Sequence, residues 1–247
     1  LINSGGSVSF TSANRGGNYL RYYSIDEAGN QQSIVSDDVN INQLPVFSAA
    51  SDDAGTIKGG TTVTVNTTAS DADSNQTIKL VVCKTIGVTG TDCDGGAGDQ
   101  YCTTTTGAGG TNPTCNWTAE SDNTTHSWYA YIFDSLNEGA AGNYKTGSYT
   151  TDSTAATVSP TNPGNGAGTS DNTPTFTGTA TENISNCQIQ VASNEGFSTI
   201  LHNGLDANVS GGTTCSYVLP DANTLSDGNY YWRMKATDTV GNAGAYD

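Results

Sequence analysis

The chain has 247 residues, of which 24 are Asp or Glu and 8 are Lys or Arg, so its formal net charge is −16. Affinity for the nucleic-acid backbone comes from Lys and Arg that neutralise phosphates, so this balance argues against nucleic acid as a partner. Thr, Asn, Gly and Ser are abundant and form helices poorly, which argues against a mainly helical fold. No run of about 18 apolar residues occurs, so we expect no direct membrane insertion of this segment.

One strand-and-turn pattern occurs three times along the chain. Each copy is an alternating, aromatic-rich run that leads to an Asp and then to a turn containing Gly and Asn or Glu. The copies are GNYLRYYSIDEAGN (17–30), HSWYAYIFDSLNEG (126–139) and NYYWRMKATDTVGN (229–242). Side chains two residues apart share one face of a strand, so we expect one face of each run to be buried. The residues expected to point inward are Leu20, Tyr22 and Ser24; Trp128, Ala130 and Ile132; and Tyr230, Trp232, Met234 and Ala236.

The spacing of these copies predicts the domain organisation. Their Asp residues are 108 and 104 residues apart, close to the length of one β-sandwich domain of about 100 residues. Pro-containing segments at 41–50 and 153–166 separate the copies, as linkers between domains do. We predict an all-β chain of antiparallel β-sandwiches, and we expect it to be part of a longer protein. The predicted parts are 1–43, the C-terminal part of one module; 44–152, a complete module with a disulfide-stapled insertion; and 153–247, a module lacking its last strand.

Three segments resemble known families. CQIQVASNEGFSTIL (187–201) and LSDGNYYWRMKATDTVGN (225–242) resemble fibronectin type III-like and immunoglobulin-like (Ig-like) repeats of bacterial and archaeal surface proteins. ASDADSNQTIKLVVCK (69–84) resembles the acidic segment of the related cadherin- or PKD-like modules. The resemblance implies tandem Ig-like sandwiches but little about function, because such domains host many roles. It also implies that Tyr230 forms a tyrosine corner, in which the hydroxyl bonds to an upstream backbone group.

The six cysteines favour disulfides. Four fall in 44–152 and two in 153–247, and even counts in a Thr- and Asn-rich chain point to an oxidising, extracellular or cell-surface location. Four cysteines allow three pairings, and the internal repeat selects one: TCNWTAE (114–120) aligns with TCSYVLP (214–220), and VVCK (81–84) with NCQI (186–189). The alternative is a zinc site, although no Cys-x-x-Cys pair occurs. The expected disulfides are Cys187–Cys215, Cys83–Cys115 and Cys93–Cys102.

The segment SDADSNQ (70–76) is a candidate calcium site. Asp71, Asp73 and Asn75 alternate, so their oxygens can converge from one side of the backbone, and Ca²⁺ takes six to eight such ligands. Asp52 and Asp53 are expected to add ligands. The alternative is an acidic loop held by Asx turns, which needs no metal. No other cofactor is expected.

Six Asn-x-Ser/Thr sequons are candidate N-glycosylation sites, although a chain this rich in Asn and Thr contains about that many by chance. They begin at Asn66, Asn75, Asn116, Asn123, Asn183 and Asn208.

No catalytic pattern is found, and we expect no enzymatic activity. The two histidines, His126 and His202, lie in different predicted modules, and neither belongs to a Gly-x-Ser-x-Gly or His-Glu-x-x-His motif. We expect a structural stalk, fibre or surface layer whose partners are copies of itself or other surface proteins. One alternative is an adhesin that binds a glycan or a partner cell through the insertion at 90–113, or through Tyr129 and Tyr131. Accessory modules of a secreted enzyme are a further alternative.

Overall fold

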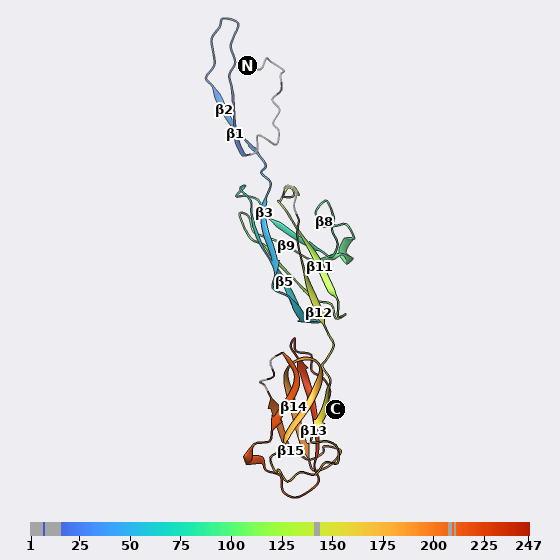
Figure 1. Cartoon of the computed structure of the whole chain (residues 1–247). Coiled ribbons are helices and arrows are strands. Elements are labelled where there is room, and N and C mark those ends of the chain that lie inside the picture. Colours follow the sequence, from blue (N-terminus) through green and yellow to red (C-terminus); the bar gives the residue numbers. More distant parts are fainter. Residues whose placement is uncertain (1–6, 8–15, 141–143, 207–208, 210) are drawn as a thin grey trace. The chain divides into compact units, whose positions relative to one another are not determined.

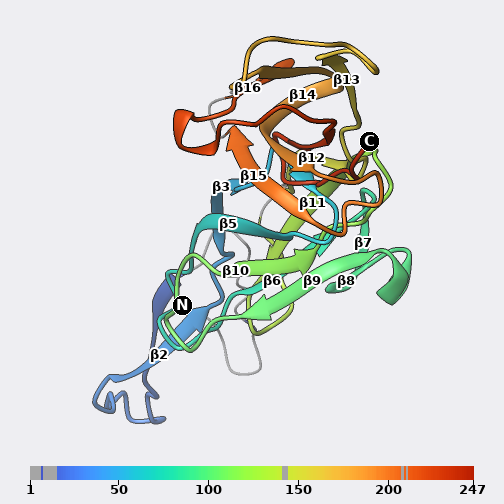
Figure 2. The ribbon, with the colours of Figure 1, turned by 90° about the horizontal axis from the view of Figure 1, so that it is seen from below.

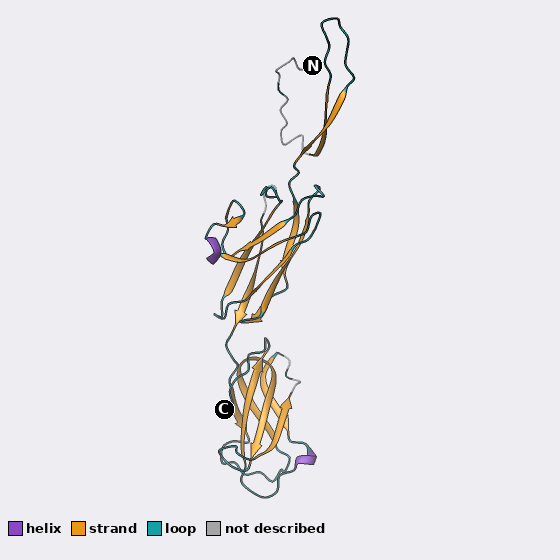
Figure 3. Ribbon diagram, turned by 180° about the vertical axis from the view of Figure 1, so that it is seen from behind, coloured by secondary structure: helices purple, strands orange, loops and turns teal. Residues whose placement is uncertain are grey.

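The fold is nearly all β, as the sequence predicts. The structure is a computed structural model that describes residues 7, 16–140, 144–206, 209 and 211–247. Strands and loops make up almost all of the described chain, and the two helices, Gly96–Gly98 and Asp221–Asn223, are single 3₁₀ turns (Figure 3). Backbone contacts divide the chain into two compact units: residues 1–53, 63–117 and 127–148 form one, and residues 54–62, 118–126 and 149–247 form the other. Neither unit coincides with a predicted module, so the module boundaries stay a prediction.

The first strands form a two-stranded antiparallel hairpin of β1 (Gly16–Tyr22) and β2 (Val35–Ile41). The prediction that Leu20, Tyr22 and Ser24 point into a core is wrong for the described residues. Tyr22 is 49% exposed and its hydroxyl donates to Asp37, while Leu20 is half-buried and Ser24 is exposed. The physical reason is that a hairpin buries an apolar face only when a further layer covers it.

Two further sheets lie face to face (Figure 1). The smaller has the strand order β10-β5-β3 and the larger has the order β4-β12-β11-β6-β9. The smaller comprises β3 (Val46–Asp52), β5 (Thr62–Ser70) and β10 (Thr114–Thr118). The larger comprises β4 (Thr56–Lys58), β6 (Lys79–Cys83), β9 (Gln100–Thr105), β11 (Thr125–Phe133) and β12 (Lys145–Asp152).

Alternation along these strands fixes which side chains enter the core. On β5, Val63 and Val65 are fully buried, while Asn66 and Thr68 are exposed. On β11, the predicted inward set of Trp128, Ala130 and Ile132 is at most 1% exposed. This is the period-two pattern of a sheet with one buried face.

The remaining long strand belongs to two layers. β14 (Thr175–Ala192) pairs through its first half with β13 (Val158–Asn162) and β16 (Gly212–Val218). Through its second half it pairs with β15 (Ile200–Asp206) and β17 (Tyr231–Asp238), and the register shifts around Ile184. Figure 2 shows β14 next to β13 and β15. Passing between layers lets β14 help to close a core around Ile189, Met234 and Cys187.

The third copy of the repeated pattern forms as predicted. Met234 and Ala236 are buried, and Trp232 packs against the same core. The Tyr230 hydroxyl donates to the carbonyl oxygen of Ser226 at 2.9 Å, the upstream bond of a tyrosine corner. A paired segment also follows this turn: Gly244 donates to Ala236, and Asp247 and Met234 exchange backbone hydrogen bonds.

Candidate functional site

The disulfide pairing differs in part from the prediction. Cys187 is bonded to Cys215, the pair that the internal alignment gives. The predicted bonds Cys83–Cys115 and Cys93–Cys102 are wrong. The observed bonds are Cys83–Cys93 and Cys102–Cys115.

The physical reason for this error is the face on which Cys83 lies. Leu80 pairs with Ile132, two residues before the turn Asp134, and Cys187 pairs with Ala236, two residues before the turn Asp238. Leu80 is therefore the equivalent of Cys187. Cys83 is three residues further along the strand, so it points to the opposite face of the sheet. Cys102 instead comes from the neighbouring strand β9, opposite Val82, and bonds to Cys115 in the other sheet.

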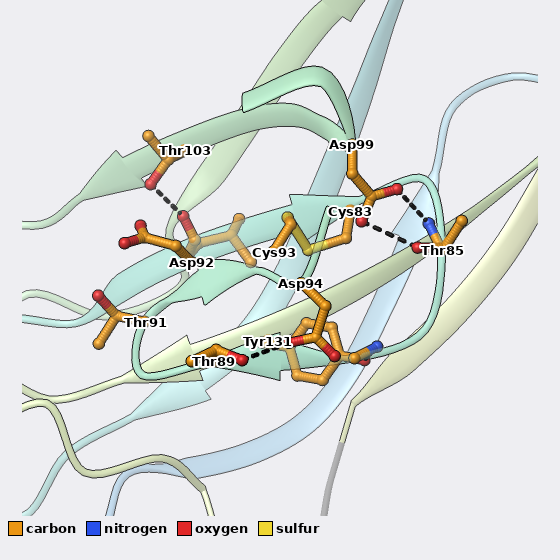
Figure 4. The surroundings of a disulfide bond; sticks show 12 residues. Cys83, Thr85, Thr89, Thr91, Asp92, Cys93, Asp94, Asp99, Thr103 and Tyr131 are labelled. Atoms are coloured by element: carbon orange, nitrogen blue, oxygen red, sulfur yellow. Dashed lines mark hydrogen bonds between the residues drawn. A yellow bond between two sulfur atoms is a disulfide. The ribbon is translucent and has the colours of Figure 1, made fainter. Parts of the chain in front are cut away.

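The insertion after β6 folds back over the outer face of its own sheet (Figure 4). The hairpin of β7 (Val88–Thr89) and β8 (Asp92–Cys93) begins it. It covers Val81, Cys83 and Phe133, which together with Cys93 form a small second core. Both faces of β6 are therefore buried, which explains why its sequence is a continuous apolar run without alternation.

Polar contacts hold this insertion in one conformation (Figure 4). Asp99 is buried and accepts hydrogen bonds from the backbone and side chain of Thr85, at 3.0 and 2.9 Å. Thr89 donates to Asp94, and the Tyr131 hydroxyl accepts from the backbone N–H of Gly87. The insertion is thus a braced surface element with defined side-chain positions.

Tyr129 and Tyr131 do not form a flat platform. Both rings lie 5.7 Å from the ring of Tyr144, at interplanar angles of 64° and 43°. The hydroxyl of Tyr131 is engaged by the insertion. These tyrosines pack against a neighbour, which is the usual role of strand aromatics.

The repeated turn has the same hydrogen bonds in all three copies. In each copy an Asp side chain accepts a hydrogen bond from the backbone N–H of the residue four positions later. Asp26 accepts from Asn30, Asp134 accepts from Glu138 and Asp238 accepts from Asn242. The residue three positions after each Asp has a positive φ, and it is Gly29, Asn137 and Gly241 in turn. The carboxylate therefore organises the turn together with backbone hydrogen bonds, because the residue at positive φ in each copy also donates its N–H to the carbonyl of the same Asp.

Two of the five predicted calcium ligands lie at an acidic group that also includes residues from outside the motif. Asp71 Oδ1 accepts from the N–H of Asp73, and Asp73 Oδ2 accepts from the N–H of Gln43. The Asn42 side-chain amide nitrogen lies between Asp134 Oδ2 at 2.7 Å and Glu138 Oε2 at 2.8 Å. We call Asn42, Asp71, Asp73, Asp134 and Glu138 the acidic pole. A polar hollow of about 320 Å³ beside it is lined in part by Asn42, Asp73 and the exposed Asn75.

The carboxylate of Asp71 has an unusual environment within the acidic pole. Its Oδ2 atom is buried and has no hydrogen-bond partner. Burial, and to a smaller extent the nearby carboxylates of Asp73 and Asp134, raise the pKa of Asp71. This oxygen therefore lacks a positive or donating partner.

Asp52 and Asp53 do not join the acidic pole. Asp52 pairs with Val65 at one end of β3, whereas Val46 at the other end pairs with Ser70, next to Asp71. Asp52 is six residues from Val46 along β3, a distance of about 20 Å, so Asp52 lies far from Asp71. Asp52 accepts from the Trp128 indole, and Asp53 accepts from the N–H of Thr64.

A second carboxylate group was not predicted from the sequence. Carboxylate oxygens of Asp152, Glu182 and Asp238 lie within 4.8 Å of one another. Burial, and to a smaller extent the charges of Asp152 and Asp238, raise the pKa of Glu182. The sequence does contain a pattern that points to this group. TATE (179–182) aligns with TASD (68–71), which places Glu182 at the position of Asp71.

The two histidines have separate structural roles. His126 Nε2 lies 2.9 Å from Asp122 Oδ1, and this contact is the main reason that the pKa of Asp122 falls to about 2. His202 Nε2 lies 2.8 Å from the hydroxyl of Tyr217, and burial lowers the pKa of His202. His126 Nε2 also lies 3.2 Å from the Thr124 hydroxyl, so each histidine ring contacts a hydroxyl group.

The described sequons differ in their surroundings. The asparagines Asn66, Asn75, Asn116, Asn123 and Asn183 are exposed, and Asn208 lies outside the described residues. Asn123 differs from the others because its side-chain oxygen accepts the N–H of Ser153 and its φ is 58°.

Solved structures of low sequence identity are similar to this chain. No family model matches the chain, and no curated protein matches it. The fibronectin(III)-like modules of CbhA from Clostridium thermocellum share 14% sequence identity, cover 81% of this chain and 90% of their own, and have a TM-score of 0.37. The FN1–FN3 domains of chicken CNTN1 share 9% identity, cover 93% of this chain and 75% of their own, and have a TM-score of 0.35. Within the described residues, neither helical turn has the length or apolarity to cross a bilayer.

Proposed function

We propose that the chain is a non-catalytic structural segment of a large extracellular or cell-surface protein, such as a stalk, fibre or surface layer. The observation that carries this proposal is the use of the cysteines: all six are bonded, in three disulfides that lie in or beside the buried cores. Disulfides persist in oxidising compartments and supplement small hydrophobic cores. Charge repulsion keeps such an acidic surface dispersed in solution.

Immunoelectron microscopy of native cells, with an antibody against residues 44–247, tests this role. A structural polymer predicts continuous label along a filament or sheet, and brief protease treatment of intact cells should remove the label. Label confined to the cell interior would contradict an extracellular role. Sparse label at the tips of isolated stalks would favour an adhesin.

Adhesion is the second candidate, and the braced insertion favours it. A loop fixed by its own core presents defined side chains to a ligand at low entropic cost. Replacing residues 86–98 with a short Gly-Ser linker, together with Cys83→Ser, should abolish binding to glycans or partner cells if the insertion recognises them. The matched control is Glu195→Gln, an exposed change on another loop. Equal binding by both variants would exclude the insertion as the recognition surface.

We also propose that the acidic pole binds Ca²⁺. The unpartnered, buried Oδ2 of Asp71 supports this proposal, because a hard cation supplies the positive partner that this oxygen lacks. The amide nitrogen of Asn42, between two carboxylates, lies where positive charge is favoured. An ion there would join the segment after β2 to the turn after β11, stiffening the junction between the predicted modules.

Calorimetric titration with Ca²⁺, followed by thermal melting with and without chelator, tests the metal. Asp71→Asn should weaken binding and remove the effect of chelator on melting. Asp53→Asn is the matched control, since Asp53 lies at the other end of the same sheet and should leave binding unchanged. If the calorimetric titration of the unmodified chain with Ca²⁺ shows no heat of binding, and its melting is the same with and without chelator, the calcium proposal is wrong.

A further inference from the structure

The outer face of the β10-β5-β3 sheet carries no charged side chain on the strands themselves within the first unit, and the exposed Asp53 directly follows β3. Its exposed side chains on these strands, within the first unit, are small, hydroxyl or amide groups, apart from Val46. They are Val46, Ser48, Ala49, Ser51, Asn66, Thr68, Ser70, Thr114 and Asn116. We call this set the hydroxyl face. In a chain of net charge −16, a neutral strip across three strands is a distinct surface.

Two sequons lie on the hydroxyl face, and packing fixes their orientation. Thr67, between Asn66 and Thr68, is 7% exposed, and its hydroxyl donates to the carbonyl of Pro113. Trp117, between Asn116 and Thr118, is 8% exposed and stacks on Tyr101. Because each middle residue points inward, the Asn and the Thr of each sequon must both point to solvent.

From this arrangement we propose that Asn66 and Asn116 carry N-linked sugars and that the hydroxyl face is covered by glycan. The neighbouring hydroxyl and amide groups can hydrogen-bond to neutral sugars, and no charge must be desolvated beneath them. This inference rests on the proposed extracellular location, because N-linked sugars are added to exported chains.

The donor is a lipid-diphosphate-linked oligosaccharide. The side-chain amide nitrogen of Asn forms a bond to the anomeric carbon of the sugar. The bond from that carbon to the diphosphate oxygen breaks, and the lipid diphosphate leaves with the electron pair. The amide nitrogen loses one proton, and no oxidant or reductant takes part.

Asn123 is the internal control for this proposal. It belongs to an intact sequon and is exposed, but its side-chain oxygen is held by the N–H of Ser153 and it lies outside the hydroxyl face. If the surface decides which sites carry sugar, occupancy at Asn123 should be below that at Asn66 and Asn116.

Glycopeptide mass spectrometry of the chain isolated from its natural host tests the inference. Peptides containing Asn66 or Asn116 should carry sugar mass at higher occupancy than the peptide containing Asn123. Unmodified peptides at both Asn66 and Asn116, or equal occupancy at all three sites, would overturn it. If the chain is on the cell surface and these peptides are bare, the glycan proposal alone fails. If the chain is intracellular, the proposed function fails as well.

Two variants expressed in the same host separate sequon chemistry from folding. Thr68→Ala removes the hydroxyl of the first sequon and should abolish sugar at Asn66 alone. Thr64→Ala lies on the same strand but in no sequon, so it should leave both sites occupied. Sugar retained at Asn66 in Thr68→Ala would show that the modification is not sequon-dependent, which also contradicts the proposal.

Discussion

At the scale of single residues, Glu182 faces two other carboxylates, and we predict that Glu182→Gln stabilises the protein at pH 7. The gain should be about 0.5 kcal/mol, the size expected for a partly exposed charge interaction. Because the folded-state pKa of Glu182 is raised, the folded state binds its proton more tightly than the unfolded state does. Glu182 therefore destabilises the fold above its folded pKa, and this penalty disappears as the pH falls to the unfolded pKa.

Urea denaturation of both proteins at pH 7 and pH 4 checks this prediction. The advantage of Glu182→Gln should be present at pH 7 and smaller at pH 4. Glu195→Gln is the control, because Glu195 is exposed on the loop before β15. A variant that is less stable than the unmodified protein at pH 7 would show that the three carboxylates are held together favourably.

The repeated turn gives a second prediction at this scale. Gly241 has φ of 97° and no heavy atom near the position of a Cβ, so Gly241→Ala meets backbone strain without a steric clash. We expect a loss of about 1–2 kcal/mol. Asn137 occupies the same turn position with φ of 64°, so Asn137→Gly should be tolerated or slightly stabilising. Thermal melting of the two variants measures the contrast, and equal losses would contradict the role assigned to the left-handed position.

At the scale of elements, the disulfides should differ in what they stabilise. Cys83–Cys93 closes the insertion, whereas Cys187–Cys215 lies inside the core around β14. We predict that Cys83→Ser with Cys93→Ser speeds hydrogen exchange mainly in residues 84–99. Cys187→Ala with Cys215→Ala should lower the free energy of unfolding of its own sandwich by roughly 3–4 kcal/mol.

Hydrogen exchange followed by mass spectrometry, with denaturant melting, separates these outcomes. A global loss of stability from opening the insertion would show that the small core around Val81 and Phe133 supports the whole sheet. Faster hydrogen exchange confined to residues 84–99 would show that the insertion is an independent surface element.

The strands were largely predictable at this scale because burial on one face forces alternation. Trp128, Ala130 and Ile132 could be placed inward from spacing alone. β6 was harder to read, because the insertion buries its outer face and removes the alternation that marks a face. The error at Cys83 arose in the same place: aligning two cysteines by their neighbours ignored which face each one occupies.

At the scale of the whole molecule, the charge of −16 predicts a salt effect. Repulsion among like charges opposes the compact state, and added salt screens it. Raising monovalent salt from about 10 mM to about 150 mM, which shortens the Debye length from about 30 to about 8 Å, should raise Tm. If screening removes about 1 kcal/mol of repulsion from the folded state, Tm should rise by about 2–4 °C.

Scanning calorimetry in NaCl and in choline chloride tests this effect. Equal shifts in both salts are expected from screening. A shift seen with sodium alone would indicate binding of a specific cation in place of screening.

The sequence by itself determined the all-β class, the inward faces of β11 and β17 and the recurrence of one Asp-centred turn. Each follows from local rules: period-two alternation, turn chemistry and spacing along the chain. Only the tertiary structure decided which cysteines meet, which acidic residues share a pole and which sequons share a face. Those outcomes depend on strand register and on how an insertion packs, which bring residues together across tens of positions. Asp71 and Asp134 meet because β5 and β11 end at the same pole of their sheets, whereas Asp52 and Asp53 lie about 20 Å away along β3.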